Sequence, residues 1–252
     1  MSSSFSAHDR VHDLAHNLAH NLIDELIRTL QDMAEQGWHG LDCSPQTLAV
    51  IRNWGASSAV SSRPDTLPQI QKDLGQCQRC ALCQSRTHII FGRGAPNAKL
   101  MFIGAEIEEE DDLKAQPFSG EAGRLLTRII AAMNLTREDV YLTHIVKCRP
   151  PNQRHPLKSE IERCKPFLDR QIEVIAPTVI CSLGRLATQV LLKTDQSISK
   201  ARGRFYDYHG IKVMPTFHPA DLLRHPRKKR DTWIDIQKIM HLLNIPVNIP
   251  VK

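Results

Sequence analysis

Cysteines are the residues of this chain whose type and spacing could do chemistry most directly. Cys77 and Cys80 are separated by two residues, so one turn of the chain can present both thiolates to one metal centre. Cys148 and Cys164 stand at the two ends of a loop that is stiffened by prolines. Four thiolates suit either a tetrahedral zinc ion or a [4Fe–4S] cluster. The spacing therefore favours a metal centre at these four residues over free thiols, and it leaves the metal open.

The remaining cysteines are weaker candidates for ligands. Cys83 follows the first pair at the same interval, whereas Cys43 lies in a stretch rich in Ser, Pro, Asp and Gly. Cys181 falls inside an apolar run, where a thiol acts as a small core residue. An odd total of seven cysteines argues against a disulfide framework.

Composition and charge narrow the function classes. The chain is 41% hydrophobic, which suffices for a sizeable core, and no apolar run approaches the roughly 20 residues of a membrane span. Because the N-terminus lacks an apolar signal-peptide region, we expect a cytoplasmic protein. Residues 1–66 hold 4 Lys/Arg and 8 Asp/Glu, a net charge of −4, and residues 67–252 hold 29 and 19, a net charge of +10. Only the second part is a candidate for binding a polyanion, with a merely basic domain as the alternative.

The elements that must position these residues follow from hydrophobic periodicity. Apolar runs predict strands, and they alternate with amphipathic stretches that are typical of helices. This alternation implies an α/β fold of three layers, α/β/α, around a central, mainly parallel, four-stranded sheet. The predicted strands are 99–104, 140–146, 178–184 and 211–217, and the predicted helices are 120–133, 158–175, 185–193 and 230–243.

The loops after the four strands are the expected binding region, because ligands bind at the carboxyl ends of strands in such sheets. Most of these loops are rich in charged residues, glycine or proline. They span residues 104–123, residues 147–157, the turn at Gly184 and residues 218–230. The sequence therefore places its reactive side chains where the topology permits binding.

The N-terminal part differs in character from the rest. Residues 8–36 carry apolar side chains at three- or four-residue steps, which predicts one amphipathic helix, and a linker follows it. A ladder of histidines on this helix is expected to form a polar stripe facing solvent or a protein partner, in preference to a metal site. The ladder consists of His8, His12, His16 and His20. We therefore predict a helical extension with a linker at 1–66 and a domain at 67–252.

Six motifs, in order along residues 77–243, resemble those of the family 4 uracil-DNA glycosylases, the iron–sulfur branch of the uracil-DNA glycosylase superfamily. They are "CQRCALCQSRT" (77–87), "QPFSGEAGRLL" (116–126), "YLTHIVKCRPPNQRHP" (141–156), "EIERCKPFL" (160–168), "VICSLGRLA" (179–187) and "PTFHPADLLR" (215–224). The resemblance implies a uracil-DNA glycosylase-like fold. It also implies a structural [4Fe–4S] cluster on Cys77, Cys80, Cys148 and Cys164, with zinc as the second choice.

The same resemblance implies a DNA repair enzyme that flips uracil out of DNA and hydrolyses its N-glycosidic bond, leaving an abasic site. Phe118 matches the family phenylalanine that stacks on the flipped base. His218 matches the histidine that faces the uracil carbonyl oxygen as negative charge builds there. Gly104 is retained from the first family motif, the loop that approaches the base.

Two positions depart from the family pattern. Ala105 stands where the family has a glutamate, and Glu106, one residue later, is the candidate that remains for positioning the attacking water. His144 stands where the family has an asparagine that reads the uracil edge with a donor and an acceptor. Two alternative hypotheses follow. The protein is either a DNA-binding iron–sulfur relative with impaired hydrolysis or a glycosylase with a shifted lesion specificity.

Cations on two neighbouring loops are expected to contact DNA phosphates, which supplies affinity without sequence reading. They are Lys147, Arg149, Arg154, Arg224, Lys228 and Arg230. For each of these side chains, the alternative is that it belongs to a solvated run of charges and does not contact DNA. The expected partner is uracil-containing DNA, with a protein partner at the N-terminal helix, and we expect a monomer.

Overall fold

The computed structural model of the protein describes residues 65–246 together with residues 28–29. The predicted helix over 8–36 and its histidine ladder therefore lie outside the described residues, apart from Arg28 and Thr29, which are helical. Asp65 already contacts the domain, since Arg170 donates to its carboxylate from Nε at 2.5 Å. Thr66 caps the first described helix of the domain, α3 (Leu67–Leu74), by accepting the Gln69 N–H at 3.3 Å. The division into an extension and a domain stays a prediction.

A six-stranded sheet forms the centre of the fold, in the order β1-β3-β2-β4-β6-β5. The four predicted strands are all present, and they run parallel as neighbours. The short outer strands β1 and β5 add antiparallel edges. The strands are β1 (Arg93–Gly94), β2 (Leu100–Gly104), β3 (Tyr141–His144), β4 (Val179–Leu183), β5 (Tyr206–Tyr208) and β6 (Ile211–Thr216). The predicted α/β class and parallel sheet are thus confirmed.

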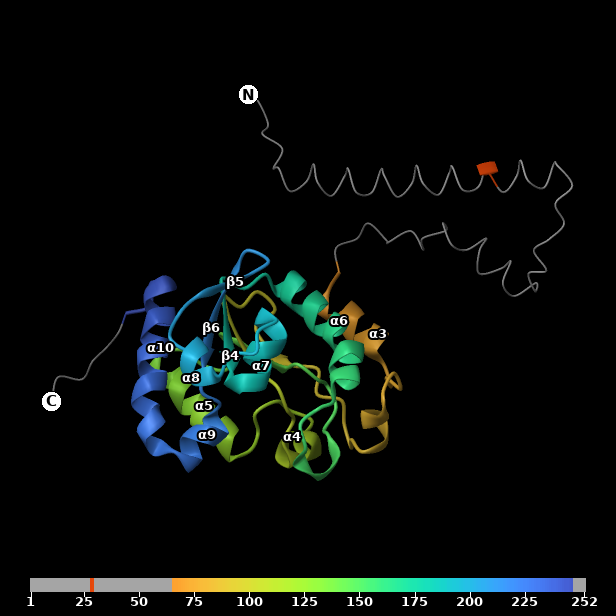
Figure 1. Ribbon diagram of the computed structural model, residues 1–252, viewed down its shortest axis with the longest axis horizontal. Helices are drawn as coiled ribbons and strands as arrows, with labels where there is room; N and C mark the ends of the chain where they lie inside the picture. Colours follow the sequence, from red (N-terminus) through yellow and green to blue (C-terminus); the bar gives the residue numbers. More distant parts are fainter. Residues whose placement is uncertain (1–27, 30–64, 247–252) are drawn as a thin grey trace, which may run out of the picture. The chain divides into compact units, whose positions relative to one another are not determined.

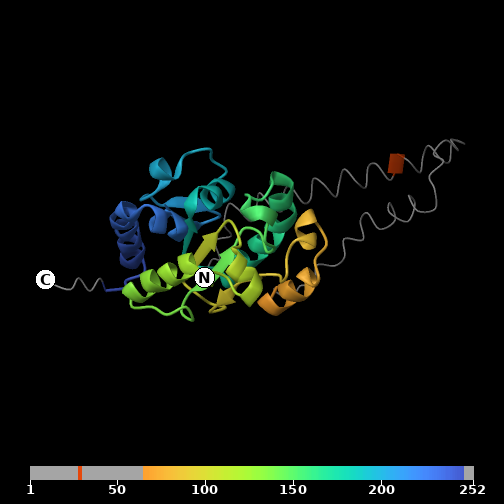
Figure 2. The same ribbon diagram turned by 90° about the horizontal axis from the view of Figure 1, so that it is seen from below.

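Helices cover both faces of the sheet, which gives the three predicted layers (Figures 1 and 2). Successive side chains of β2 point to opposite faces, so Leu100 and Phe102 pack with helices α5 and α10, while Met101 and Ile103 pack with α6 and α7. The residues of β2 and β4 are buried throughout, as expected of parallel strands covered on both sides. These helices are α5 (Glu121–Ala132), α6 (Lys158–Ile175), α7 (Gly184–Leu192) and α10 (Lys229–Leu242).

Shorter elements shape the loops at the sheet's edge. The described residues also contain three single-turn helices and three one-to-two-turn helices that the periodicity did not predict. They are η1 (Ala81–Gln84), η2 (Pro151–Gln153), η3 (Pro226–Lys228), α4 (Glu109–Lys114), α8 (Ile198–Ala201) and α9 (Pro219–Arg224). Among the described residues, no helix is both long enough and apolar enough to cross a membrane.

A buried carboxylate ties helix α10 to the sheet. Asp235 is fully buried and accepts hydrogen bonds from the Thr216 hydroxyl on β6 at 2.7 Å and from Arg202 Nε at 2.9 Å. A second Arg202 nitrogen donates to the other oxygen of this carboxylate at 2.7 Å. Asp231, one turn earlier, lies 3.9 Å from the same guanidinium and is half exposed.

We predict that Asp235→Ala lowers the free energy of unfolding by about 3–5 kcal/mol, because it leaves a partly buried guanidinium without its charge partner. Asp231→Ala serves as the matched control and should change stability by less than about 0.5 kcal/mol. Urea unfolding followed by circular dichroism measures both. Equal effects of the two substitutions would contradict the role of Asp235.

Candidate active site

A cleft of about 450 Å³ opens at the carboxyl ends of the parallel strands, where the topology predicts a binding site. The loops after β2, β3, β4 and β6 all contribute side chains to it. Those that bear charge or titrate include Glu106, Glu108, His155, Arg185, His218 and Arg224. Of the predicted site residues, the cleft thus brings together Glu106, His218 and Arg224.

His218 lies at the end of β6, where it is the N-cap of α9. Its Nδ1 accepts the Ala220 N–H at 3.3 Å, so the proton of the neutral ring is on Nε2. Burial, together with the nearby charge of Arg224, lowers the pKa of His218 to about 4. Gly184 has a φ of +84°, and a Cβ there would lie 3.1 Å from the His218 Cβ. The backbone at Ala220 and at Gly184 therefore holds a neutral imidazole that can donate from Nε2.

The three predicted base-binding residues lie against one another. Gly104 pairs with His144 across β2 and β3, and the His144 ring stacks on Phe118 with a centroid distance of 4.4 Å and an interplanar angle of 24°. A Cβ on Gly104 would lie 2.9 Å from both rings, so only glycine leaves room for the pair. Both rings are buried and neither lines the cleft. The imidazole therefore covers one face of Phe118, and the His218 ring lies 6.3 Å from the Phe118 ring between centroids.

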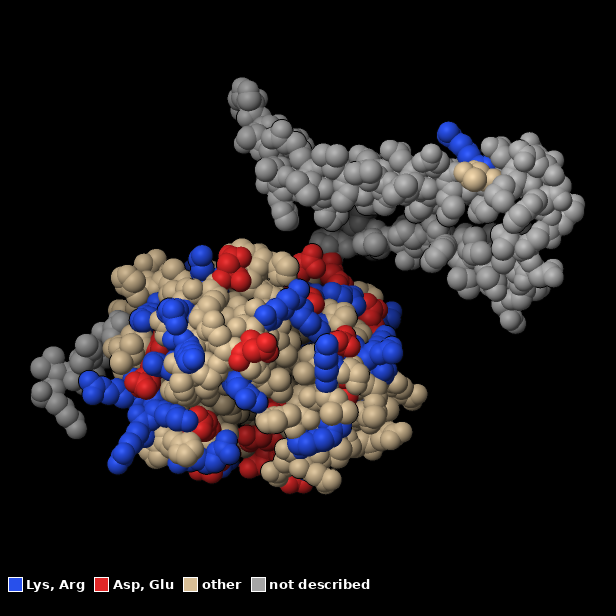
Figure 3. Space-filling model, in the orientation of Figure 1, with Lys and Arg blue, Asp and Glu red and all other residues tan. Residues whose placement is uncertain are grey.

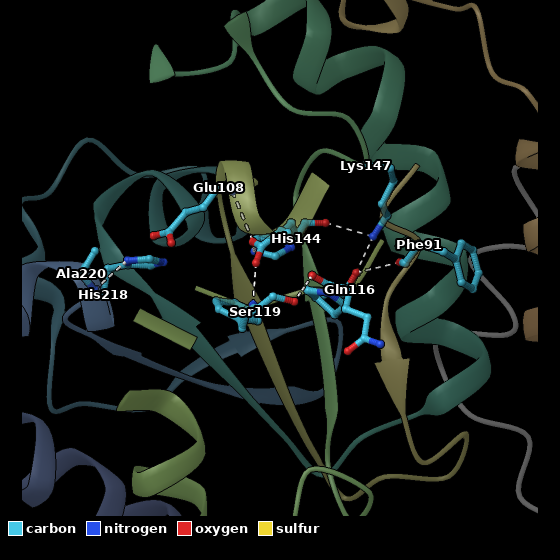
Figure 4. Close-up of polar contacts among 12 residues, drawn as sticks. Phe91, Glu108, Gln116, Ser119, His144, Lys147, His218 and Ala220 are labelled. Carbon is cyan, nitrogen blue, oxygen red and sulfur yellow. Dashed lines mark hydrogen bonds and ion pairs between the residues drawn. The ribbon is translucent and has the colours of Figure 1, made fainter. Parts of the chain in front are cut away.

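A buried carboxylate organises the loop that carries Phe118. Asp111 accepts the backbone N–H of Ser119 at 2.5 Å and that of Glu108 at 3.2 Å, and its Oδ2 lies 3.9 Å from His144 Nε2. In Figure 4, Glu108 and Ser119, whose N–H groups donate to Asp111, lie on either side of His144. Burial raises the pKa of Asp111 and lowers that of His144 well below its usual value. Among the described residues, His144 Nδ1 has no hydrogen-bond partner.

Sequence reasoning missed a pair of side chains at the mouth of the cleft. His155 Nδ1 is hydrogen-bonded to the Glu106 carboxylate, and both residues line the cleft. Nearby, Arg149 lies 3.4 Å from Glu109, so the two loops are joined twice. One feature of the sequence could have indicated this pair. A histidine stands between Arg154 and Pro156, in a loop that the topology predicts to be part of the binding region.

The four predicted ligand cysteines line one small pocket, as their spacing suggested, whereas Cys83 is not part of its lining. Arginines surround the pocket, and Arg86 donates to the Cys148 sulfur at 3.3 Å. The Lys147 backbone N–H donates to the Cys164 sulfur at 3.2 Å. Burial raises the pKa of the Cys148 thiol to about 11. Within the described part of the chain, no three His, Cys, Asp or Glu side chains are gathered closely enough for a single metal ion.

The prediction that Lys147 contacts DNA is wrong. Its side chain is fully buried, and its Nζ donates to the Thr143 hydroxyl, the His144 carbonyl and the Gln171 amide oxygen at 2.5–2.9 Å. Burial lowers the pKa of Lys147 to about 7. In Figure 4 it lies on the side of His144 opposite His218. Lys147 follows a strand end closely, and spacing alone cannot show that the side chain turns inward.

The other predicted DNA-binding cations differ in whether a carboxylate of the protein already pairs with them. Arg224 and Arg230 are exposed, whereas Arg154 is held by Glu160 at 2.7 Å and Lys228 by Asp221 at 2.7 Å. Figure 3 shows acidic side chains interspersed with basic ones on the face of the molecule that it draws. Phosphate contacts by Arg154 or Lys228 would therefore compete with carboxylates of the protein itself.

Comparisons with known proteins agree with this fold and with the predicted family. The family model of the uracil DNA glycosylase superfamily matches residues 91–237. The type-4 uracil-DNA glycosylase of Saccharolobus solfataricus is 42% identical over 189 residues, which cover 71% of this chain and 88% of that protein. The type-4 enzyme of Archaeoglobus fulgidus is 37% identical over 186 residues, 71% of this chain and 94% of its own. That of Thermotoga maritima is 40% identical over 181 residues, 70% and 94% respectively. The chain therefore belongs to the uracil-DNA glycosylase superfamily, with type-4 uracil-DNA glycosylases among its relatives.

Proposed function

We propose that the protein is a DNA repair glycosylase that flips uracil out of DNA and hydrolyses its N-glycosidic bond, leaving an abasic site. The geometry of His218 carries this proposal. Its ring lies in the cleft at the end of β6, with Nδ1 engaged by the Ala220 N–H and Nε2 free to donate. A donor fixed in this way suits the carbonyl oxygen of a base that leaves as an anion.

The chemistry of the leaving group explains why a neutral histidine is useful. When the bond between the sugar C1′ and the base N1 breaks, its electron pair stays on the base, and negative charge spreads to the carbonyl oxygen beside N1. A fixed donor at that oxygen stabilises the transition state more than the ground state. Because the pKa of His218 is about 4, the ring is neutral at physiological pH and needs no proton before it donates.

Phe118, His144 and Gly104 form the proposed base-binding group. If the base stacks on the face of Phe118 that His144 covers, the imidazole turns aside first, since one face of a ring holds one partner. Turning exposes His144 Nδ1, which has no partner among the described residues, to the edge of the base. Glu106, at the mouth of the cleft, is the proposed group for positioning the attacking water.

Cys77, Cys80, Cys148 and Cys164 are the proposed ligands of a [4Fe–4S] cluster, with zinc as the runner-up. The fit rests on the donor set, because four sulfurs line one pocket and two of them already accept N–H bonds from Arg86 and Lys147. Bound there, the cluster would fasten the loop between Cys148 and Cys164 to the turn at Cys77. The raised pKa of the Cys148 thiol means that binding must release protons.

DNA is the proposed partner, and Arg149, Arg154, Arg224, Lys228 and Arg230 are the proposed phosphate contacts. The protein partner at the N-terminal helix, the monomeric state and the cytoplasmic location expected from the sequence remain part of the proposal. Two observations favour a second candidate function, a DNA-binding protein with impaired hydrolysis. His144 covers Phe118, and Ala105 replaces the family glutamate.

We predict that the protein releases uracil from a single-stranded oligonucleotide, detected as strand breaks after alkali. His218→Ala should lower the single-turnover rate by about 10²–10³-fold, as expected when one donor to a developing anion is lost. His241→Ala on the exposed side of α10 is the matched control and should react like the wild type. Salt-sensitive DNA binding without uracil release would support the second candidate function instead.

We predict that His144→Asn raises the uracil release rate, by about 10-fold, because the shorter amide uncovers Phe118 and offers a donor and an acceptor on one edge. Single-turnover kinetics on the same oligonucleotide provide the measurement, with His241→Asn as the control. A lower rate in His144→Asn would mean that the imidazole itself reads the base.

We predict that Cys164→Ala loses iron and visible absorbance on purification, because the cluster loses a ligand, whereas Cys83→Ala keeps both. Iron and sulfide analysis of the three proteins, prepared without oxygen, gives the comparison. Equal iron in Cys164→Ala and the wild type would remove Cys164 from the ligand set, and zinc in the wild type would exclude the iron–sulfur assignment.

A further inference from the structure

We propose that His155 is a further catalytic residue, the general base that takes a proton from the attacking water. Glu106 is then a positioning residue that orients the His155 ring. This inference rests on the proposed function. It assigns to the Glu106–His155 pair the water-activating task that is left open where Ala105 replaces the family glutamate.

The hydrogen bond between the two side chains fixes the tautomer. The Glu106 carboxylate can only accept, so the His155 Nδ1 donates to it, and Nε2 of the neutral ring carries the lone pair. A carboxylate that holds one ring nitrogen and leaves the other basic is the arrangement of acid–base histidines in many hydrolytic sites. The His155 side chain is 73% exposed, so water reaches it.

The position of the pair complements that of His218. Glu106 follows β2 and His155 lies on the loop after β3, whereas His218 follows β6, and all three line the same cleft. Hydrolysis needs a donor for the departing base and a base for the entering water on different sides of the sugar. The cleft therefore offers one imidazole for each task, with opposite hydrogen-bonding roles.

The other carboxylates of the cleft are less suited to the task. Burial and the nearby charges of Asp111 and Glu110 raise the pKa of Glu108, which favours its protonated form. The Asp221 carboxylate is engaged by Lys228 at 2.7 Å. Of the described residues that line the cleft, His155 thus combines exposure to water with a nitrogen that remains free to accept a proton.

The proposed step balances in atoms and charge. The water oxygen forms a bond to the sugar C1′ as the bond from C1′ to the base N1 breaks, and the electron pair of that bond leaves with uracil. One water proton passes to His155 Nε2, which makes an imidazolium that the Glu106 carboxylate stabilises. The proton then returns to solvent or to the uracil anion, and neither oxidant nor reductant takes part.

Several other titratable and charged groups line the cleft with His155 and contribute to any pH dependence of the rate. The titratable and charged groups that line the cleft with it are Glu106 and Glu108 after β2, Arg185 on α7, and His218, Asp221 and Arg224 at the β6 end. On its own loop, Arg154 is paired with Glu160. The pKa of His218 lies at about 4, so a loss of rate through the mildly acidic range would not come from His218.

The test compares single-turnover uracil release and DNA affinity over a range of pH. His155→Gln should lower the rate by about 100-fold or more, the usual contribution of a general base, and should change the pH profile of the rate. Glu106→Gln should lower the rate by about 10-fold or more, because its amide no longer stabilises the imidazolium. DNA affinity should change less than about 3-fold in both variants, since the effect is on the chemical step. Glu173→Gln, on the exposed side of α6, and His241→Gln are the matched controls and should behave like the wild type.

A role that is only structural gives different results. If the pair merely ties two loops together, His155→Gln keeps the pH profile of the wild type and loses DNA affinity in proportion to rate, which would overturn the inference. Added imidazole should restore part of the rate of His155→Ala, and no restoration would count equally against it. A wild type that binds uracil-containing DNA and never releases uracil would overturn the proposed function and this inference together. Normal release by His155→Gln would overturn this inference alone.

Discussion

The parallel pairing of four strands that are buried on both faces is the constraint on which the site depends. Such strands have no solvent-facing side on which to carry polar chemistry, so reactive side chains collect at the ends of the strands. Lys147, which enters the interior from this edge, has three hydrogen-bond acceptors around its ammonium. The buried ammonium of Lys147 is thus fully hydrogen-bonded, and the cost of burying its charge lowers the pKa of Lys147.

The acidic loop after β2 places its carboxylates differently from what its sequence suggests. A run of carboxylates at 108–112 suggests negative charge facing the base, which would repel DNA. Instead, Asp111 accepts backbone N–H groups of the Phe118 loop, and Asp112 accepts those of Thr87 and His88 at 2.7–2.9 Å. Two of the five carboxylates in the run, Asp111 and Asp112, therefore turn inward and fix the loop, because buried backbone donors require acceptors.

The sequence predicted the central strands and the long helices to within one or two residues, because each is long enough to show a clear period. It missed β1 and β5, which have two and three residues and show none. It grouped Gly104 with His144, a pairing that the register of β2 and β3 brings about. It missed the pair of Glu106 and His155, which are 49 residues apart and meet only because two loops share one edge of the sheet. Long-range loop contacts of this kind leave no periodic signal.

The position of His155 depends on more than its bond to Glu106. A hydrogen bond from an exposed histidine to a carboxylate, like an exposed ion pair, contributes only about 0–1 kcal/mol, too little to fix a loop against its conformational entropy. The loop is instead held at its roots, where Ser85 donates to the Arg149 carbonyl at 3.0 Å and Arg86 donates to the Cys148 sulfur. Prolines between these roots and His155 reduce the number of conformations that remain. The cysteine pocket therefore influences the cleft through the placement of this loop and not through direct contact. How firmly the loop is held at its roots determines how well His155 is positioned in the cleft.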